Sequence, residues 1–238
     1  PILVAFRARF GNYPATKFFM GKMNCATNRI SMTLGLAFVV GLGPVAGNDW
    51  PQWRGPERDG ISKETGLLKQ WPAGGPRLVW KATGLGSGYS SVAVVGERIY
   101  TTGDRADANY LVALNRADGK VIWSAKLGAK SGAPGWGGFA GPRATPTVDG
   151  NLIFALDQWG EIACFDTASG KEIWRKNFVT DFGGSRPEWG FSESPPADGD
   201  RVLATPGGSK GAIVALDKHT GQVRYQIGDE LASYASLK

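Results

Sequence analysis

The sequence contains very few of the residues that most often build catalytic and metal sites. Its 238 residues include one histidine, His219, and two cysteines, Cys25 and Cys164. A Ser-His-Asp triad or a multi-histidine metal site is therefore not expected, and no catalytic residue or metal ligand is assigned. A disulfide framework is not expected either, because only Cys164 would remain in an exported mature chain.

Acidic residues are absent from residues 1–47, which carry five basic ones. Without that segment, 22 basic residues stand against 21 acidic residues, so the formal net charge of +6 comes almost entirely from the N-terminal end. The charge of the remainder does not favour a nucleic-acid partner.

Residues 20–47 have the order of features typical of a signal peptide. A basic region is followed by an apolar run over residues 32–40 and by small residues at 45–47. A membrane anchor is the alternative, but the run is short and is interrupted by Gly41, Gly43 and Pro44. We expect cleavage, export to the periplasm or the extracellular space, and no stable membrane span afterwards. Residues 1–19 are interpreted as a non-native or upstream translated segment.

One eleven-residue motif occurs three times at a fixed spacing. Its copies span residues 113–123, 164–174 and 215–225, and each begins 51 residues after the one before. The recurring positions are Ala113, Asn115, Gly119 and Trp123, then Cys164, Asp166, Gly170 and Trp174, then Ala215, Asp217, Gly221 and Tyr225. A period near 50 residues built from short strands is typical of propeller blades.

Each part of the motif has a physical role in a turn between two strands. Asn or Asp opens the turn by accepting hydrogen bonds from nearby backbone amides, and Gly closes it at a positive φ. The aromatic residue then buries its face against a neighbouring sheet. We therefore expect Asn115 and Asp166 to bond their own turns, and Trp123 and Trp174 to be deeply buried between blades.

Three full units of four short strands are predicted within residues 90–226. First strands are expected at 91–94, 145–148 and 194–197, and second strands at 98–101, 152–155 and 201–204. The third strand of each unit leads into the motif, and the fourth carries its aromatic residue. The predicted fold class is all-β, a β-propeller of four-stranded antiparallel blades without a long helix.

Three units do not close a ring, because propellers contain ~4–8 blades. Residues 77–81, with Trp80, resemble the last strand of another unit, and residues 234–237 resemble the start of a further one. We interpret residues 77–238 as a partial propeller, an open arc of about three blades, and the chain as a fragment of a longer protein. Residues 48–76 are an N-terminal extension whose tryptophans pack onto the body. Exposed strand edges predict poor solubility.

The motif Ala-x-Asp-x-x-x-Gly-x-x-x-Trp resembles the tryptophan-docking motif of the pyrroloquinoline-quinone (PQQ) repeat β-propellers. Two further segments, Trp-Pro-Gln-Trp-Arg-Gly-Pro at 50–56 and Trp-Gly-Phe-Ser-Glu-Ser-Pro at 189–195, resemble a secreted bacterial branch of that family. The resemblance covers most of residues 49–236. It implies the fold but no particular cofactor, because the group includes quinone-dependent alcohol dehydrogenases and non-catalytic relatives, among them an outer-membrane assembly lipoprotein.

For the dehydrogenases, the resemblance implies PQQ beside Ca²⁺ in the central funnel, an Asp base and often two adjacent cysteines. This sequence has no adjacent cysteine pair, and none of its carboxylates or amides is matched to the calcium ligands. No cofactor is assigned, and PQQ with Ca²⁺ is expected only in a full-length homologue. Our hypothesis is a secreted scaffold for binding or assembly. The alternative is a PQQ-dependent alcohol dehydrogenase-type oxidoreductase.

The candidate binding residues lie in the loops between units and in the turns between second and third strands. In a four-stranded blade these segments emerge at the same end of the sheet, and would form a funnel mouth. The residues are Trp136, Arg143, Trp159, Arg186, Trp189 and Glu193. Aromatic side chains with a few convergent charges fit a small molecule or a glycan. The scaffold hypothesis adds an unknown protein partner for the chain as a whole. The other interpretation is that these tryptophans fill the channel and pack the long loops.

Overall fold

A computed structural model describes residues 48–135 and 139–238 of the chain. The predicted signal peptide, residues 1–19 and Trp136 lie outside the described residues. The strands are β1 (Ala93–Val95), β2 (Arg98–Asp104), β3 (Asn109–Asn115), β4 (Val121–Gly128), β5 (Thr147–Asp149), β6 (Leu152–Leu156), β7 (Glu161–Asp166), β8 (Glu172–Asn177), β9 (Ala197–Asp198), β10 (Arg201–Ala204), β11 (Ile213–Asp217) and β12 (Val223–Ile227). Within the described ranges, no helix is long and apolar enough to cross a membrane.

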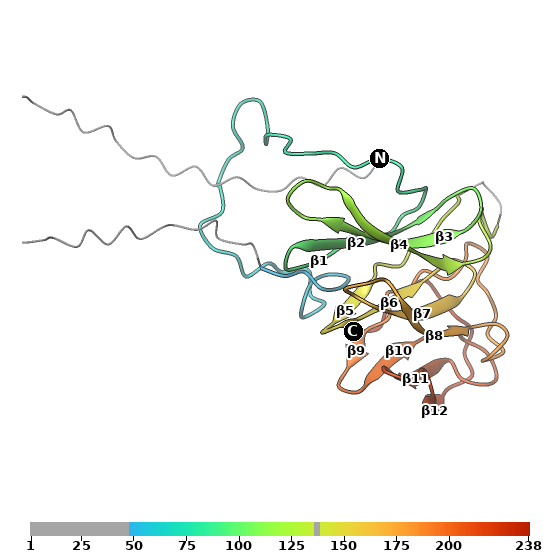
Figure 1. Cartoon of the computed structure of the whole chain (residues 1–238). Helices are drawn as coiled ribbons and strands as arrows, with labels where there is room; N and C mark the ends of the chain where they lie inside the picture. Colours follow the sequence, from blue (N-terminus) through green and yellow to red (C-terminus); the bar gives the residue numbers. More distant parts are fainter. Residues whose placement is uncertain (1–47, 136–138) are drawn as a thin grey trace, which may run out of the picture.

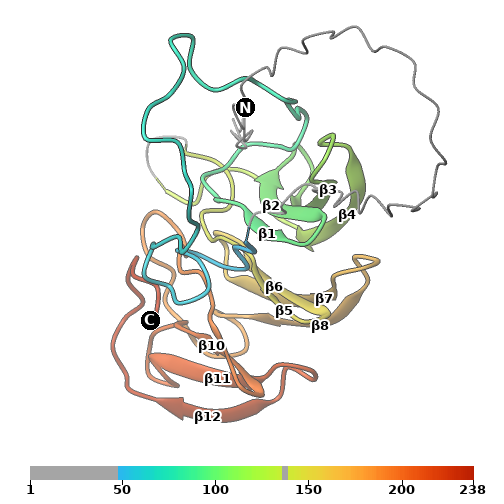
Figure 2. The same cartoon turned by 90° about the vertical axis from the view of Figure 1, so that its left-hand side faces the viewer.

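These strands form three four-stranded antiparallel sheets, β1–β4, β5–β8 and β9–β12, each in sequence order. The sheets lie one after another along an open arc, from green to red in Figure 1. The predicted fold class is therefore confirmed. We call β1, β5 and β9 the inner strands; Figure 2 shows β1 and β5 on the same side of the sheets as the C-terminal segment.

The inner strands begin later than the sequence predicts. The predicted strand at 194–197 is reduced to the two residues of β9, and the one at 145–148 becomes β5. Pro146, Pro195 and Pro196 explain the difference, because proline has no amide hydrogen to donate to a ladder.

Apolar side chains fill both spaces between the sheets. Sheet β1–β4 meets sheet β5–β8 through a buried cluster that includes Tyr100, Leu111, Ile153 and Phe165. Sheet β5–β8 meets sheet β9–β12 through a second cluster that includes Phe154, Trp174, Val202 and Leu216. A third cluster lies on the face of sheet β1–β4 that is turned away from sheet β5–β8, where Trp50 and Trp80 pack against Ile99 and Leu114.

The tryptophan at the end of each unit packs on the motif glycine of the next. A Cβ added at Gly170 would lie 2.7 Å from the Trp123 ring, and one at Gly221 would lie 2.7 Å from the Trp174 ring. Trp80 covers Gly119 in the same way. The indole N–H groups donate to carbonyl oxygens in the same three turns, those of Arg116 (3.0 Å), Thr167 (3.1 Å) and Lys218 (2.9 Å). Trp174 is 7% exposed, whereas Trp123 is less buried than expected and remains partly exposed at the rim of its sheet.

The motif turns have the expected side-chain and backbone geometry. Asn115 Oδ1 accepts from Ala117 N, Asp166 Oδ1 from Ser169 N, and Asp217 Oδ1 from Thr220 N, each at 2.8 Å. The three motif glycines have φ values of 70° to 71°, in the left-handed region that glycine adopts without strain. Ala113, Cys164 and Ala215 lie opposite the aromatic residue of their own unit and are fully buried.

Candidate functional site

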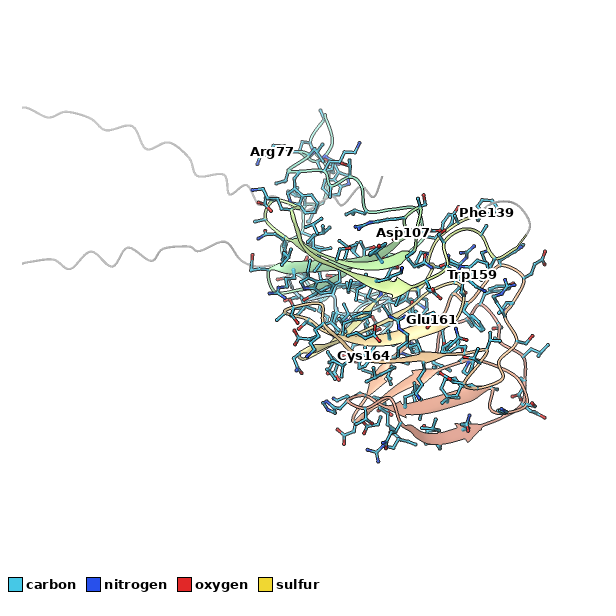
Figure 3. The ribbon with its side chains drawn as sticks, turned by 45° about the vertical axis from the view of Figure 1, so that its right-hand side comes forward. Arg77, Asp107, Phe139, Trp159, Glu161 and Cys164 are labelled. Atoms are coloured by element: carbon cyan, nitrogen blue, oxygen red, sulfur yellow. The ribbon has the colours of Figure 1, made fainter. Side chains whose placement is uncertain are left out.

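The loops that carry the predicted site emerge at one end of the three sheets. Because neighbouring strands are antiparallel, the connections 129–146 and 178–196 leave the sheets at the same end as the turns 105–108 and 157–160. Figure 3 shows Asp107, Phe139 and Trp159 together at this end, with Arg77 far from them. We call this end the loop face.

An aromatic group surrounds Arg143 on the loop face. The Arg143 guanidinium lies 5.8 Å from the centroid of the Tyr89 ring, and Tyr89 meets Phe139 edge to face at 6.0 Å. Trp189 and Tyr234 form a second pair at 5.8 Å, and Trp189 N donates to Tyr234 Oη at 3.3 Å. Burial lowers the pKa of Arg143, and the Tyr89 and Tyr234 phenols oppose that shift. We call these five residues the mouth cluster.

The aromatic side chains of the mouth cluster are exposed to solvent. Tyr89 and Trp189 are each 58% exposed, Phe139 is 57% and Tyr234 is 49% exposed. The Arg143 guanidinium donates to the carbonyl oxygens of Gly141 and Phe139. Within the described part of the chain, it pairs with no carboxylate. The cluster therefore offers open aromatic faces beside a cation whose charge is not neutralised by a neighbouring acid.

Two members of this cluster, Tyr89 and Tyr234, were missed by the sequence reasoning as candidate binding residues, although the repeat contains a signal for both. A serine or threonine recurs at the start of each unit, and the residue two positions before it is also at an equivalent place in every unit. The pairs are Tyr89 and Ser91, Arg143 and Thr145, Ser192 and Ser194, and Tyr234 and Ser236. Successive units are joined there, since Thr145 N donates to Ser194 Oγ and Ser194 N donates to Ser236 Oγ, both at 2.9 Å. Tyr89, Arg143 and Tyr234 therefore occupy one repeated position along the arc.

A second group on the loop face surrounds Trp159. Lys130 Nζ lies 5.2 Å and the Arg186 guanidinium carbon 5.1 Å from its ring, both within the range of cation–π attraction. Arg186 also donates to the Pro134 carbonyl oxygen at 2.7 Å. These contacts join two successive loops across the turn that carries Trp159, so Trp159 and Arg186 hold this part of the loop face together.

Glu193 is separated from the exposed candidates by its burial. It is 1% exposed, and its carboxylate accepts hydrogen bonds from the backbone amide and the hydroxyl of Thr205. Burial raises its pKa to about 7, and the hydrogen bonds from Thr205 and the charge of Arg58 act in the opposite direction. Among the predicted residues, the structure thus brings Trp159 and Arg186 together, places Arg143 and Trp189 in the mouth cluster, and keeps Glu193 inside.

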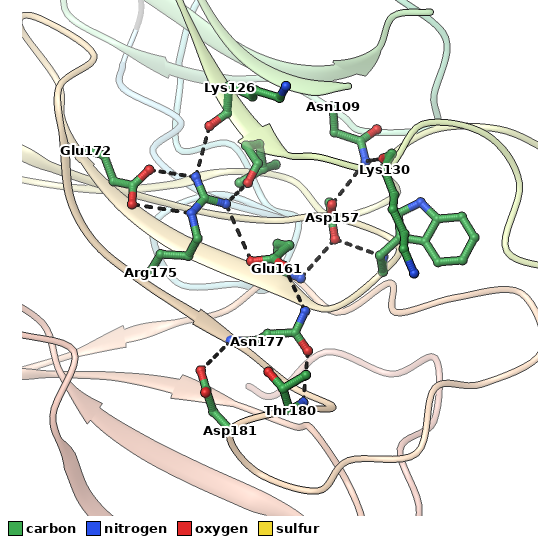
Figure 4. Close-up of polar contacts among 12 residues, drawn as sticks. Asn109, Lys126, Lys130, Asp157, Glu161, Glu172, Arg175, Asn177, Thr180 and Asp181 are labelled. Carbon is green, nitrogen blue, oxygen red and sulfur yellow. Dashed lines mark hydrogen bonds and ion pairs between the residues drawn. The ribbon is translucent and has the colours of Figure 1, made fainter. Parts of the chain in front are cut away.

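A polar junction between the first two sheets supports the loop face (Figure 4). The buried Asp157 carboxylate accepts from Asn109 Nδ2 at 3.0 Å, from Trp159 N at 2.8 Å and from Glu161 N at 2.9 Å. Burial raises the pKa of Asp157 to about 6. Nearby, Arg175 lies between Glu172 and Glu161 and reaches the carbonyl oxygen of Lys126 at 3.0 Å.

The calcium ligands that the family resemblance implies are not matched among the described residues. Among residues 48–135 and 139–238, no group of three or more His, Cys, Asp or Glu side chains is placed to hold a metal ion. The buried carboxylates of Asp157 and Glu193 are already engaged by Asn109 and Thr205.

Comparison with protein families gives one matching profile. The family described as outer membrane protein assembly factor BamB matches residues 68–158 and 127–237. A curated relative, outer membrane protein assembly factor BamB of Shewanella oneidensis, is 34% identical over 124 residues, which cover 48% of this chain and 28% of the relative. The chain thus spans less than a third of the length of that relative.

Solved structures to which the chain is similar include an alcohol dehydrogenase and an assembly factor. Quinohemoprotein alcohol dehydrogenase from Comamonas testosteroni is 16% identical with a TM-score of 0.53, and the match covers 75% of this chain and 27% of the enzyme. BamB from Moraxella catarrhalis is 22% identical with a TM-score of 0.41, over 63% of this chain and 39% of that protein. At these identities, the likeness to the dehydrogenase concerns the fold alone.

Proposed function

Because the chain belongs to the PQQ-like β-propeller family whose profile is described as outer membrane protein assembly factor BamB, we propose that it is an exported scaffold that binds another protein through its loop face. The acid-poor N-terminal segment with its apolar run supports export to the periplasm or the extracellular space. The curated relative named as an assembly factor supports a scaffold role.

The observation that carries this proposal is the exposure of the mouth cluster. Tyr, Trp and Arg are the residues most enriched at the energetic centres of protein interfaces. Here Tyr89, Trp189 and Tyr234 each leave about half of their surface open around Arg143. Monomeric proteins usually cover such neighbouring aromatic side chains unless a ligand uses them. An acidic or carbonyl-rich segment with an apolar side chain fits this surface.

Site-specific photo-crosslinking in the cells that make the protein tests this function. A photoreactive residue is placed at Tyr89 or Trp189 on the loop face, and at Ala168 or His219 in the motif turns as controls. The four positions are all exposed. We expect a discrete crosslinked protein from the first pair and none from the second. Equal products from both pairs, or no product from the loop face, would contradict the proposal.

A glycan ligand is the competing occupant of the same face. Binding to an array of glycans, compared between the wild-type chain and Trp189→Ala, measures it directly. We expect no glycan that depends on Trp189. A saturable, Trp189-dependent glycan without any crosslinked protein would replace the scaffold with a lectin-like function. The likeness in fold to the alcohol dehydrogenase does not identify any residue that would bind a protein or a glycan.

A further inference from the structure

The N-terminal residues 49–60, which we call the strap, lie along the inner strands as a separate bound segment. Trp50 and Val94 of β1 exchange two backbone hydrogen bonds of 2.7 and 2.8 Å, and Val148 of β5 donates to the Pro51 carbonyl oxygen at 2.8 Å. Figure 2 shows this blue segment on the inner side of the sheets, close to the C-terminal end. The strap therefore extends two inner strands by backbone pairing, as a peptide does when it binds to a sheet edge.

Arg58 fixes the other end of the strap. Its side chain is buried at 5% exposure and donates to Ser194 O at 2.7 Å, to Leu237 O at 2.8 Å and to Gln52 Oε1 at 3.0 Å. Its φ of 52° lies in a region that residues other than glycine rarely adopt. Such a conformation persists only where the surrounding contacts hold it, and it often marks a functional contact.

Charge complementarity accompanies these hydrogen bonds. The buried carboxylate of Glu193, one residue before Ser194, is the charge that acts on the Arg58 guanidinium. Two backbone carbonyls and a nearby carboxylate form a receptor for a guanidinium group, since arginine presents several N–H donors in a fixed fork. These groups come from the connection that precedes β9 and from the C-terminal segment, not from the strap.

A long exposed connection joins the strap to the propeller. Residues 61–79 contain no strand, and large apolar side chains in it, such as Ile61, Leu67 and Trp71, are 47 to 63% exposed. The family profile begins at residue 68, after the strap. A pocket of about 250 Å³ also lies between Gln52 and residues of β5 and β9.

From these contacts, we propose that the inner edge of the arc is a peptide-binding site that the strap occupies in cis. The site takes an extended segment that pairs with β1 and β5 and carries an arginine that enters between the carbonyl oxygens of Ser194 and Leu237. The strap is held there by its tether at a high effective concentration, which keeps the site closed to peptides of the same chemistry supplied in trans. This site uses backbone groups of β1, β5, Ser194 and Leu237 and none of the mouth-cluster side chains, and the inference does not depend on the proposed function.

The test uses the full chain with a protease site in the connection 61–79, which tethers the strap to the propeller. A site-specific protease sequence is inserted between Gly74 and Gly75, where an added Cβ would meet no atom within 4 Å. A fluorescent peptide with the sequence of residues 48–60 is then titrated against the intact and the cleaved protein, with anisotropy as the measurement. We expect saturable binding to the cleaved protein and none to the intact one, because only cleavage allows the tethered strap to be replaced.

Two peptide variants and a fold control make the outcome decisive. Arg54 is the matched control for Arg58, since both have positive φ and both lie 5.3 Å from the Trp53 ring, but Arg54 Nη2 bonds only within the strap, to Asp59 O at 3.0 Å. We expect the Arg58→Ala peptide to bind at least about tenfold more weakly, and the Arg54→Ala peptide to bind within about threefold of the unmodified one.

Circular dichroism of the cleaved protein checks that it remains folded. Unfolding on cleavage would show that the strap is an integral part of the core, and would overturn the proposal. Failure of the labelled peptide to exchange over days, or equal weakening by both substitutions, would overturn it as well. Because none of these measurements involves the loop-face partner, a failed crosslinking experiment leaves this result intact.

Discussion

The indole N–H of Trp174 donates to the carbonyl oxygen of Lys218 at 2.9 Å, and the same ring covers Gly221. One side chain thus joins the second sheet to the motif turn of the third by a hydrogen bond and by close packing. Trp123 makes the equivalent pair of contacts with Thr167 and Gly170. The three motifs are equally spaced in the sequence because each one supplies the same contact between neighbouring sheets.

Replacing Trp174 with alanine should lower the free energy of unfolding by ~3–5 kcal/mol, the range for emptying a large buried aromatic site. The loss combines the buried ring with the hydrogen bond to Lys218. Urea denaturation followed by fluorescence or circular dichroism measures it. Tyr225→Ala is the matched control, because Tyr225 has the same place in the third motif but is 38% exposed. We expect that control to change stability by less than about 1 kcal/mol; equal losses for the two variants would count against the docking role.

Replacing Gly221 with alanine should also destabilise the protein, for two separable reasons. Its φ of 70° is unfavourable for an L-residue by ~1–2 kcal/mol, and its Cβ would lie 2.7 Å from the Trp174 ring. Gly150→Ala isolates the first term, since Gly150 has a φ of 59° and no atom within 4 Å of an added Cβ. We expect Gly221→Ala to be the more destabilising of the two by thermal or urea denaturation. If Gly150→Ala costs as much, contact with the indole is not what requires glycine.

The sequence predicted the arrangement of strands well, because a local and repeated pattern of residues determines the strands and the turns between them. Four short strands per unit, the turn roles of Asn115 and Asp166, and the all-β class all follow from chemistry within about ten residues. The shortened strand β9 was predicted less well, although its prolines were visible. Burial of Trp123 was overestimated, since the sequence does not show how far an outer strand projects from the arc.

The candidate site was predicted only in part, because it depends on which loops meet. The turn of Trp159 and the loop of Arg186 were expected at the same end of the sheets, and their contact follows from that placement. Glu193 has the same sequence neighbourhood as the exposed candidates, yet its carboxylate turns inward to Thr205. Arg58 was not identified, because no local pattern shows that it reaches residues 136 and 179 positions further along the chain.

Acidic pH should stabilise the protein through Glu193. Burial raises the pKa of its carboxyl group from 4.5 to about 7 in the folded state, so the folded protein binds a proton more readily than the unfolded chain. Stability from this group is therefore fully present below pH 4.5 and is lost as the pH rises to about 7, with a slope of up to about 1.4 kcal/mol per pH unit.

Glu193→Gln removes this titration while keeping the shape of the side chain. Urea denaturation from pH 4.5 to 8 should show a flatter profile for the variant than for the wild-type protein. A smaller dependence of the same sign should persist in the variant, because burial also raises the pKa of Asp157, to about 6. Identical profiles for the two proteins would show that the Glu193 carboxyl does not titrate in this window.

Arg175 should contribute more to stability than its partly exposed position implies. It connects β8 to β4, because its guanidinium donates to the carbonyl oxygens of Lys126 and Leu127 while it pairs with Glu172 at 2.6 Å. Arg175→Ala leaves those carbonyls without their donor, and should cost ~1–3 kcal/mol in urea denaturation.

Arg201→Ala is the control, since Arg201 pairs with Asp198 of its own sheet and its side chain is 41% exposed, against 29% for Arg175. That surface pair should contribute ~0–1 kcal/mol and lose even this in high salt, whereas the Arg175 effect should persist there because carbonyl acceptors are less sensitive to screening. Arg175→Lys keeps the charge but not the planar fork, so it should recover only part of the loss. Full recovery by lysine would mean that charge alone holds β8 to β4, and that the bonds to the two carbonyl oxygens add nothing.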